Sequence, residues 1–295
     1  MYPTLFTIGK WNIATYTILL DLGLVLGLVL TYFEGKRVLG KGETALDLGL
    51  WTVIGGIVGG RLGYVLANWR AFSEDWIRAL RIWEGGLSLH GAFLGGLLVL
   101  GVFAALQRKS DEARGEDDRL PSAMGYALKL GDLLTPGLAL GIAFGWAACL
   151  MGGCAYGLVG EGFGYLIMPD LFGVEAPRFA TQIVGLVYAL VLFAGFWLLR
   201  KHWPFAGAAF LMYVLLYFGG QFLLEFTRGD EAIYVGPWRL AQWVDLALAL
   251  AAAGGLMALW WQALGPAADT AEITGNAEPG GADLEQGEPT ASDGV

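Results

Sequence analysis

One of the two histidines in this 295-residue sequence, His90, lies in an otherwise apolar stretch between Leu89 and Gly91. Imidazole titrates near neutral pH, so a histidine in such a place could act as a general base. It could equally be a hydrogen-bonded histidine that only packs between helices. Arg61 also falls in an apolar stretch, where ionisable side chains usually face the protein interior or a water-filled cavity. Both residues are candidates for a buried polar site.

A second group of polar residues recurs at a spacing of four. This spacing places Tyr217, Gln221 and Glu225 on one face of a helix, with Arg228 one turn beyond. A buried carboxylate at Glu225 needs a cation, which Arg61 or Arg228 could supply. The same arrangement is compatible with a buried ion pair that only joins helices.

The only two cysteines, Cys149 and Cys154, are too few for a disulfide framework. On one helix they would point about 140° apart, and the sequence offers no further Cys or His ligand near them for a metal. We interpret both as small apolar packing residues.

The elements that must position these residues are membrane-spanning helices. The sequence is 56% hydrophobic and only 15% charged, whereas a soluble domain carries about 25% charge. Stretches long enough to cross a bilayer occur at about 11–33, 45–66, 87–106, 131–153, 180–199, 205–226 and 239–262. Glycines four apart in the second stretch (Gly56 and Gly60, Gly59 and Gly63) favour close helix approach. We predict an all-α integral membrane protein with about seven transmembrane helices.

The loop charges predict the orientation in the membrane. Ten Lys and Arg residues fall in the loops after the first, third and fifth stretches, against seven on the opposite side. This bias puts the N-terminus outside and the C-terminus in the cytoplasm. Residues 265–295 contain seven acids and no Lys or Arg. We therefore predict a transmembrane domain at 1–264 and a disordered acidic cytoplasmic tail at 265–295.

With this orientation, the polar residues of the spans gather in the outer half of the bilayer. An ion or proton path would need polar groups through both leaflets, whereas a cluster confined to one suits a cavity that opens outward and accepts a charged head group. A transporter is therefore disfavoured. The cluster contains Tyr16, Arg61, Ser88, His90, Gln182, Tyr217, Gln221, Glu225, Arg239 and Asp245.

Two successive motifs resemble those of prolipoprotein diacylglyceryl transferases. They are GGRLGYVL at 59–66 and IWEGGLSLHG at 82–91. Further features are similar in order and spacing over about residues 5–260, namely Tyr16, Asp132, Gly157, Thr181, Gln182 and the segment from Tyr217 to Arg228. The resemblance implies seven helices, an outside N-terminus and a multi-pass location in the bacterial plasma (inner) membrane. It implies transfer of a diacylglyceryl group from phosphatidylglycerol, or a similar anionic phospholipid, to the lipobox cysteine of an exported preprolipoprotein. No metal, cofactor or nucleic acid is expected.

The resemblance also implies roles for individual residues. His90 would be a base or orienting group, Arg61 would lie in the lipid pocket, and Glu225 would order a nearby cation. Tyr217, with Tyr16, would hold the head group. His90, Arg61, Tyr217 and Glu225 are thus the expected catalytic set, and the expected substrate-binding residues are Tyr16, Ser88, Gly157, Gln182, Gln221, Arg228 and Arg239.

The sequence departs from the family pattern at polar positions. Trp146 and Gln221 stand where the family has arginines, and Cys149 and Cys154 stand where it has an asparagine and often a glutamate. Neither Trp nor Gln supplies a formal positive charge to a phosphate. Two functions therefore stay open: a lipid-modifying transferase, or a catalytically impaired or repurposed relative that serves as a lipid- or partner-binding membrane scaffold.

Overall fold

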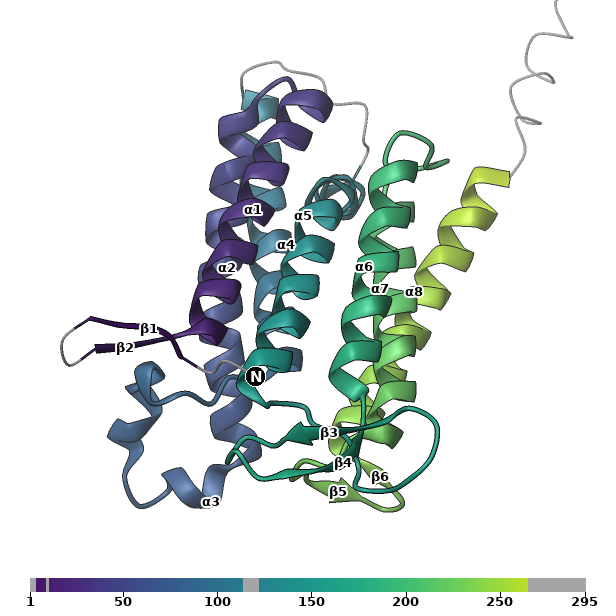
Figure 1. Cartoon of the computed structure of the whole chain (residues 1–295). Coiled ribbons are helices and arrows are strands. Elements are labelled where there is room, and N and C mark those ends of the chain that lie inside the picture. The colour runs from purple at the N-terminus through teal and green to yellow at the C-terminus, as the bar shows by residue number, and fades with distance from the viewer. Residues whose placement is uncertain (1–3, 9–10, 114–121, 265–295) are drawn as a thin grey trace, which may run out of the picture.

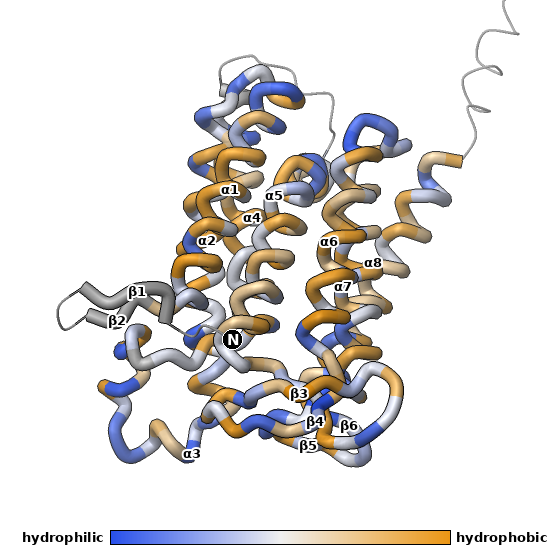
Figure 2. The backbone as a smooth tube through the Cα atoms, viewed as in Figure 1, coloured by the Kyte–Doolittle hydropathy of each residue, from blue (hydrophilic) through white to orange (hydrophobic). Residues whose placement is uncertain are grey.

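Seven helices long and apolar enough to cross a membrane make up most of the computed structural model, which describes residues 4–8, 11–113 and 122–264. They run side by side and are largely hydrophobic along their length (Figures 1 and 2). The seven-helix prediction is confirmed. The helices are α1 (Thr15–Val38), α2 (Gly42–Ala67), α4 (Leu89–Ala113), α5 (Ala123–Gly152), α6 (Thr181–Leu199), α7 (Ala208–Leu224) and α8 (Leu240–Leu264).

Short elements gather at one end of the bundle, which we name the hairpin end (Figure 1). Three two-stranded antiparallel hairpins lie there: β1 (Thr4–Ile8) with β2 (Trp11–Ala14), β3 (Tyr165–Pro169) with β4 (Glu175–Phe179), and β5 (Tyr234–Val235) with β6 (Trp238–Arg239). The same end carries α3 (Trp69–Phe72), η1 (Trp76–Leu80), η2 (Ile82–Glu84) and η3 (Glu225–Thr227). These strands were not predicted, because two to five residues are too few for a recognisable alternating pattern.

The predicted bounds were wrong at three helices, of which α4 ends at Ala113 rather than near residue 106. Helix α5 begins at Ala123 rather than near residue 131, because Ser122 caps it by accepting a hydrogen bond from the Gly125 N–H at 3.0 Å. Helix α1 begins at Thr15 rather than at residue 11, because residues 11–14 pair with β1.

Asp132 consequently lies well inside α5 rather than at its start. Its carboxylate accepts hydrogen bonds from the backbone N–H groups of Gly207 at 2.6 Å and Phe210 at 2.8 Å. These donors belong to the first turn of α7, which has no intrahelical acceptor for them. Asp132 therefore joins α5 to the start of α7, at the end opposite the hairpins.

Glycines bring α2 and α4 into close contact, as their spacing predicted. A Cβ atom at Gly59 would lie 2.4 Å from the Gly91 carbonyl oxygen, and one at Gly95 would lie 2.2 Å from the Gly55 carbonyl oxygen. Only glycine permits this backbone approach. The contact fixes the start of α4, and with it His90, relative to Arg61 in α2.

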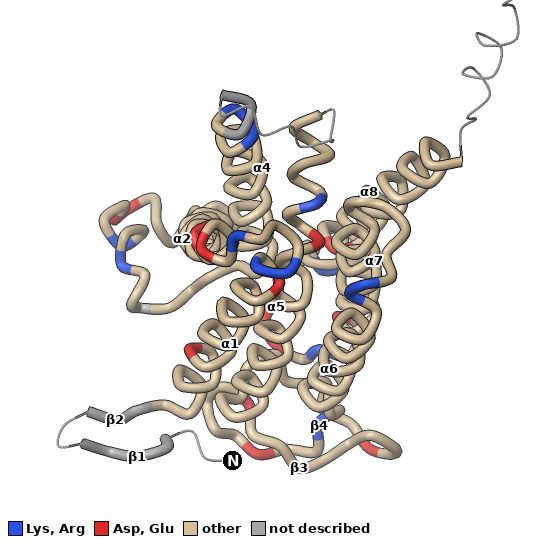
Figure 3. Tube along the Cα trace, turned by 90° about the horizontal axis from the view of Figure 1, so that it is seen from above, with Lys and Arg blue, Asp and Glu red and all other residues tan. Residues whose placement is uncertain are grey.

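The charged residues lie mainly at helix ends and in loops, and most of each helix carries neither sign (Figure 3). The N-terminal hairpin lies at the hairpin end, whereas α8 finishes at the opposite end, which we name the loop end (Figure 1). The two ends of the described chain are thus at opposite ends of the bundle. Which end faces the cytoplasm stays a prediction, and the acidic segment 265–295 lies outside the described residues.

Candidate active site

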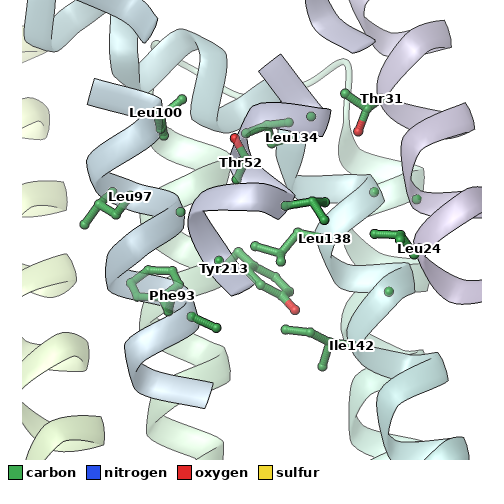
Figure 4. A pocket seen from close by; sticks show the side chains of 18 of the residues that line it. Leu24, Thr31, Thr52, Phe93, Leu97, Leu100, Leu134, Leu138, Ile142 and Tyr213 are labelled. Atoms are coloured by element: carbon green, nitrogen blue, oxygen red, sulfur yellow. The ribbon is translucent and has the colours of Figure 1, made fainter. Parts of the chain in front are cut away.

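An apolar cavity of about 290 Å³ lies among α1, α2, α4, α5 and α7. Its walls are mostly leucine, phenylalanine and glycine, and the oxygens visible among the labelled side chains are the hydroxyls of Thr31, Thr52 and Tyr213 (Figure 4). Such a lining suits hydrocarbon chains and offers nothing to neutralise a charge. Tyr217 and Phe218, farther along α7 toward the hairpin end, also line it.

A histidine–aspartate pair lies beside this part of the cavity. His90 Nε2 is 2.7 Å from Asp245 Oδ1, and the pair joins the start of α4 to α8. The Asp245 side chain is 1% exposed and that of His90 is 19% exposed. The His90 ring packs 6.0 Å from the ring of Phe218. The second carboxylate oxygen, Oδ2, is buried and has no hydrogen-bond partner among the described residues.

Two arginines and two carboxylates form a second assembly, which we name the arginine network: Glu225, Arg228, Asp230 and Arg239. Arg228 donates to Glu225 Oε1 at 2.5 Å and, in a forked contact, to Asp230. Arg239 donates to Glu225 Oε2 and Asp230 Oδ1, both at 3.1 Å. Its remaining Nη2 donates to the backbone carbonyls of Arg228 at 2.9 Å and Asp230 at 2.8 Å. The network is formally neutral. Of the two cations that the sequence offered for Glu225, Arg228 pairs with it and Arg61 does not, and Arg239 pairs with it as well.

The arginines determine the ionisation of Asp230 in this network. Burial by itself raises the pKa of Asp230, but hydrogen bonds and charge from Arg228 and then Arg239 outweigh burial and hold the pKa below its usual value. Asp230 is therefore ionised near neutral pH, and both arginines are matched by negative charge.

Arg61 points its guanidinium into the segment between α2 and α4. Nε donates to the carbonyl of Ala79 at 2.8 Å, Nη1 to those of Gly85 and Gly86, and Nη2 to those of Arg78 and Arg81. Arginine has five N–H donors, and five carbonyls receive them here. The side chain is 6% exposed and is not among the residues that line the cavity. The structure thus places the Arg61 guanidinium against the segment between α2 and α4, outside the lining of the apolar cavity.

Gly157 and Gln182 place the segment after α5 against the arginine network. Gly157 forms a β-bridge with Arg228, and a Cβ atom there would lie 2.0 Å from the Phe179 carbonyl oxygen, so no larger residue fits. Gln182 Nε2 donates to the Cys154 carbonyl at 3.0 Å, while its buried Oε1 has no partner among the described residues. Both residues therefore act on the shape of the site through backbone contacts.

The interpretation of the cysteines as packing residues on one helix was wrong, because Cys149 and Cys154 form a disulfide. Helix α5 ends at Gly152, and Gly153 adopts a left-handed conformation with φ of 76°. The chain therefore turns back and brings the two Cα atoms to 4.7 Å. Cytoplasmic thiols are generally kept reduced, so this bond favours an oxidising compartment at the hairpin end.

The remaining predicted residues lie around the same end. Tyr16 is 37% exposed and packs on Gly152, and Ser88 accepts a hydrogen bond from the Gly91 N–H at 3.3 Å in the first turn of α4. Gln221 is 3% exposed, and its Nε2 has no partner among the described residues. Trp146 is 8% exposed and packs against Gly185.

Two residues of the site were absent from the predicted catalytic and substrate-binding sets: Asp245, which was predicted only as a member of the polar cluster, and Asp230, which was not predicted at all. An acid within the last apolar stretch was a signal for Asp245, but nothing in the sequence pairs it with a histidine 155 positions earlier. Asp230 follows a helix without any periodic pattern, so it had no signal of its own.

The fold and the site together define a polytopic membrane protein whose apolar cavity leads to buried polar groups at one end. The sequence pattern of prolipoprotein diacylglyceryl transferases matches residues 3–260, and the chain belongs to this family. Family members are transferases, so the resemblance seen in the motifs is confirmed.

Similar curated proteins are named phosphatidylglycerol–prolipoprotein diacylglyceryl transferase. One from Gloeobacter violaceus is 33% identical over 88% of this chain and 92% of its own length. One from a Nostoc species is 31% identical over 85% of this chain and 87% of its own length. A protein from Clostridium perfringens, whose name carries the number 2, is 28% identical over 83% of this chain and 90% of its own length.

Proposed function

We propose that the chain transfers the diacylglyceryl group of phosphatidylglycerol, or a similar anionic phospholipid, to the lipobox cysteine thiol of an exported preprolipoprotein. The observation that carries this proposal is the apolar cavity, which reaches Tyr217 and Phe218 beside the His90–Asp245 pair. Acyl chains in the cavity would place the glycerol and phosphate near those polar groups. The names of the relatives support the choice of lipid and protein substrate.

The chemistry balances without a cofactor. The cysteine sulfur forms a bond to the glycerol carbon that carried the phosphate, and the bond between that carbon and its oxygen breaks. The electron pair leaves with glycerol phosphate, and the thiol proton passes to a base and then to the phosphate or to water. A thiolate is the attacking species, so a base beside the thiol accelerates the step. Among the proposed site residues, His90 is the group suited to this role.

The leaving phosphate also needs positive charge, and here the structure raises a second candidate function. The guanidinium donors of Arg61, Arg228 and Arg239 go to carbonyls and carboxylates within the chain. Trp146 and Gln221 bring no charge. Loss of one charged donor at such a site costs about 3–4 kcal/mol in the barrier, or roughly 100- to 1,000-fold in rate. This favours a lipid- or partner-binding scaffold over a fast enzyme.

Complementation separates the two functions. The chain is expressed in a bacterium whose resident transferase is depleted, and a reporter prolipoprotein is analysed by mass spectrometry for the added diacylglyceryl mass. Transfer above the empty-vector level supports the enzyme. A correctly inserted chain that gives no product contradicts it and favours the scaffold. Co-purified phospholipid, identified in the same preparation, then tests whether the cavity holds lipid.

The proposed location is the bacterial plasma membrane, with the hairpin end outside. Reporter fusions after residue 264 and within the loop between α6 and α7 test the orientation. Activity of a cytoplasm-specific reporter at both positions agrees with it, and activity of a periplasm-specific reporter contradicts it.

A further inference from the structure

We propose that Asp245 is a positioning residue for His90, and that the substrate thiol completes a triad with these two side chains. This inference rests on the proposed function and deepens it. The one described hydrogen bond of Asp245 goes to His90, at 2.7 Å. Its side chain is 1% exposed, and no arginine or lysine among the described residues forms an ion pair with it, so the imidazole is its one ion-pair partner there.

The ring orientation gives each nitrogen a separate task. Nε2 faces the carboxylate, so the neutral ring carries its proton there and donates to Asp245. Nδ1 has no hydrogen-bond partner among the described residues, so its lone pair is available to a thiol. When the ring takes the thiol proton, the carboxylate stabilises the imidazolium that forms, as in Ser-His-Asp hydrolases. The bonds that form and break are those of the proposed transfer. The proton moves from the thiol sulfur to Nδ1, and then to the oxygen of the phosphate that leaves.

The nucleophile must come from outside the chain. The sequence has two cysteines, and both are consumed in the disulfide between Cys149 and Cys154. The third member of the triad is therefore the substrate cysteine, because neither cysteine of this chain has a free thiol beside Asp245 and His90. The alternative is that the pair only joins α4 to α8. The unpaired Oδ2 of Asp245 argues against this alternative, because a buried carboxylate with a purely structural role would have both oxygens hydrogen-bonded.

The experiment compares Asp245→Asn with Glu34→Gln in the full-length protein. Glu34 is a matched control, since it is 4% exposed and pairs with Arg37 and Arg200 at the loop end, away from the His90–Asp245 pair. Asparagine keeps the shape of Asp245 but not its charge. We expect kcat to fall about 10²- to 10⁴-fold with KM unchanged. Glu34→Gln should lower the melting temperature and leave kcat unchanged.

A double variant distinguishes positioning from packing. If Asp245 acts through His90, then Asp245→Asn should cost no further activity in a His90→Ala background. Independent, multiplicative losses would overturn the proposal, as would an unchanged kcat in Asp245→Asn alone.

A spectroscopic readout does not depend on transfer. The chain has two histidines, so a His202→Gln variant labelled with nitrogen-15 histidine reports on His90 alone. We expect the neutral ring to carry its proton on Nε2, and Asp245→Asn to redistribute it. A proton on Nδ1 overturns the proposal. If the wild-type chain transfers no lipid, the proposed function fails, and this spectrum still decides whether Asp245 orients the ring.

Discussion

The two polar assemblies at the hairpin end differ in how fully their hydrogen-bonding capacity is used. In the arginine network, each guanidinium meets carboxylates, and Arg239 also takes two backbone carbonyls. In the His90–Asp245 pair, one nitrogen and one carboxylate oxygen have no partner among the described residues. An assembly whose charges are paired holds the backbone in place, whereas an open nitrogen and an open carboxylate oxygen beside a cavity can accept a substrate.

The comparison also bears on whether the arginines that are present can replace the two family arginines that this chain lacks. Arginines that are satisfied within the protein cannot also bind a phosphate without giving up those bonds. We therefore expect Arg61, Arg228 and Arg239 to shape the site rather than to bind the phosphate. We expect the catalytic capacity of the chain to depend on the pair beside the cavity.

The largest effect is expected at the pair. His90→Ala removes the proposed base and should lower the transfer rate by about 10²- to 10⁴-fold. It should also lower the melting temperature, because it leaves the buried Asp245 carboxylate without its partner. The other histidine, exposed His202 at the loop end, provides the control, and His202→Ala should transfer at the wild-type rate. Equal rates for both variants would remove His90 from the mechanism.

Arg239→Ala should act on stability instead. It leaves Glu225, which is 4% exposed, with one cation fewer, and removing one partner of a buried ion pair costs about 3–5 kcal/mol. Thermal unfolding in detergent measures the loss. Arg70→Ala, at an exposed position of the same end, should leave the unfolding temperature unchanged. A stable Arg239→Ala protein with reduced lipid binding would instead make Arg239 a phosphate ligand.

The disulfide should contribute less. It closes a short loop beside the arginine network, where Gly157 bridges Arg228, and chain entropy sets its contribution at about 2 kcal/mol. Cys149→Ser and reduction of the wild type should lower the melting temperature equally, and the folded fraction should keep its transfer rate. A loss of transfer without a change in melting temperature would show that the bond acts on the chemistry.

The smallest effect concerns pH. The pKa of Asp230 is lower in the folded protein, so its contribution is fully present above the unfolded pKa of about 3.9 and is lost as pH falls through the folded value. The stability difference between wild type and Asp230→Asn should therefore be constant near neutral pH and shrink as the pH falls below the unfolded pKa. Unfolding measured in guanidinium chloride at several pH values tests the sign, and a difference that grows in acid would contradict it.

Much of the architecture could be predicted from the sequence because the bilayer imposes a length and a composition on each span. The spans follow from the lengths of the apolar stretches. The close approach of α2 to α4 follows from glycines four apart, and the ion pair of Glu225 with Arg228 follows from their spacing of three. The start of α5 could not be predicted this way, because polar residues such as Lys129 extend the helix beyond its apolar part.

The sequence by itself determined which residues are too polar for the bilayer, and so which must be buried in the protein. Only the tertiary structure decided their partners. His90 meets Asp245, Arg61 meets the loop carbonyls, and Cys149 meets Cys154 after a turn at Gly153. The physical reason is that hydrogen bonds are short-range and directional, so partners depend on helix packing and loop turns that no local pattern specifies.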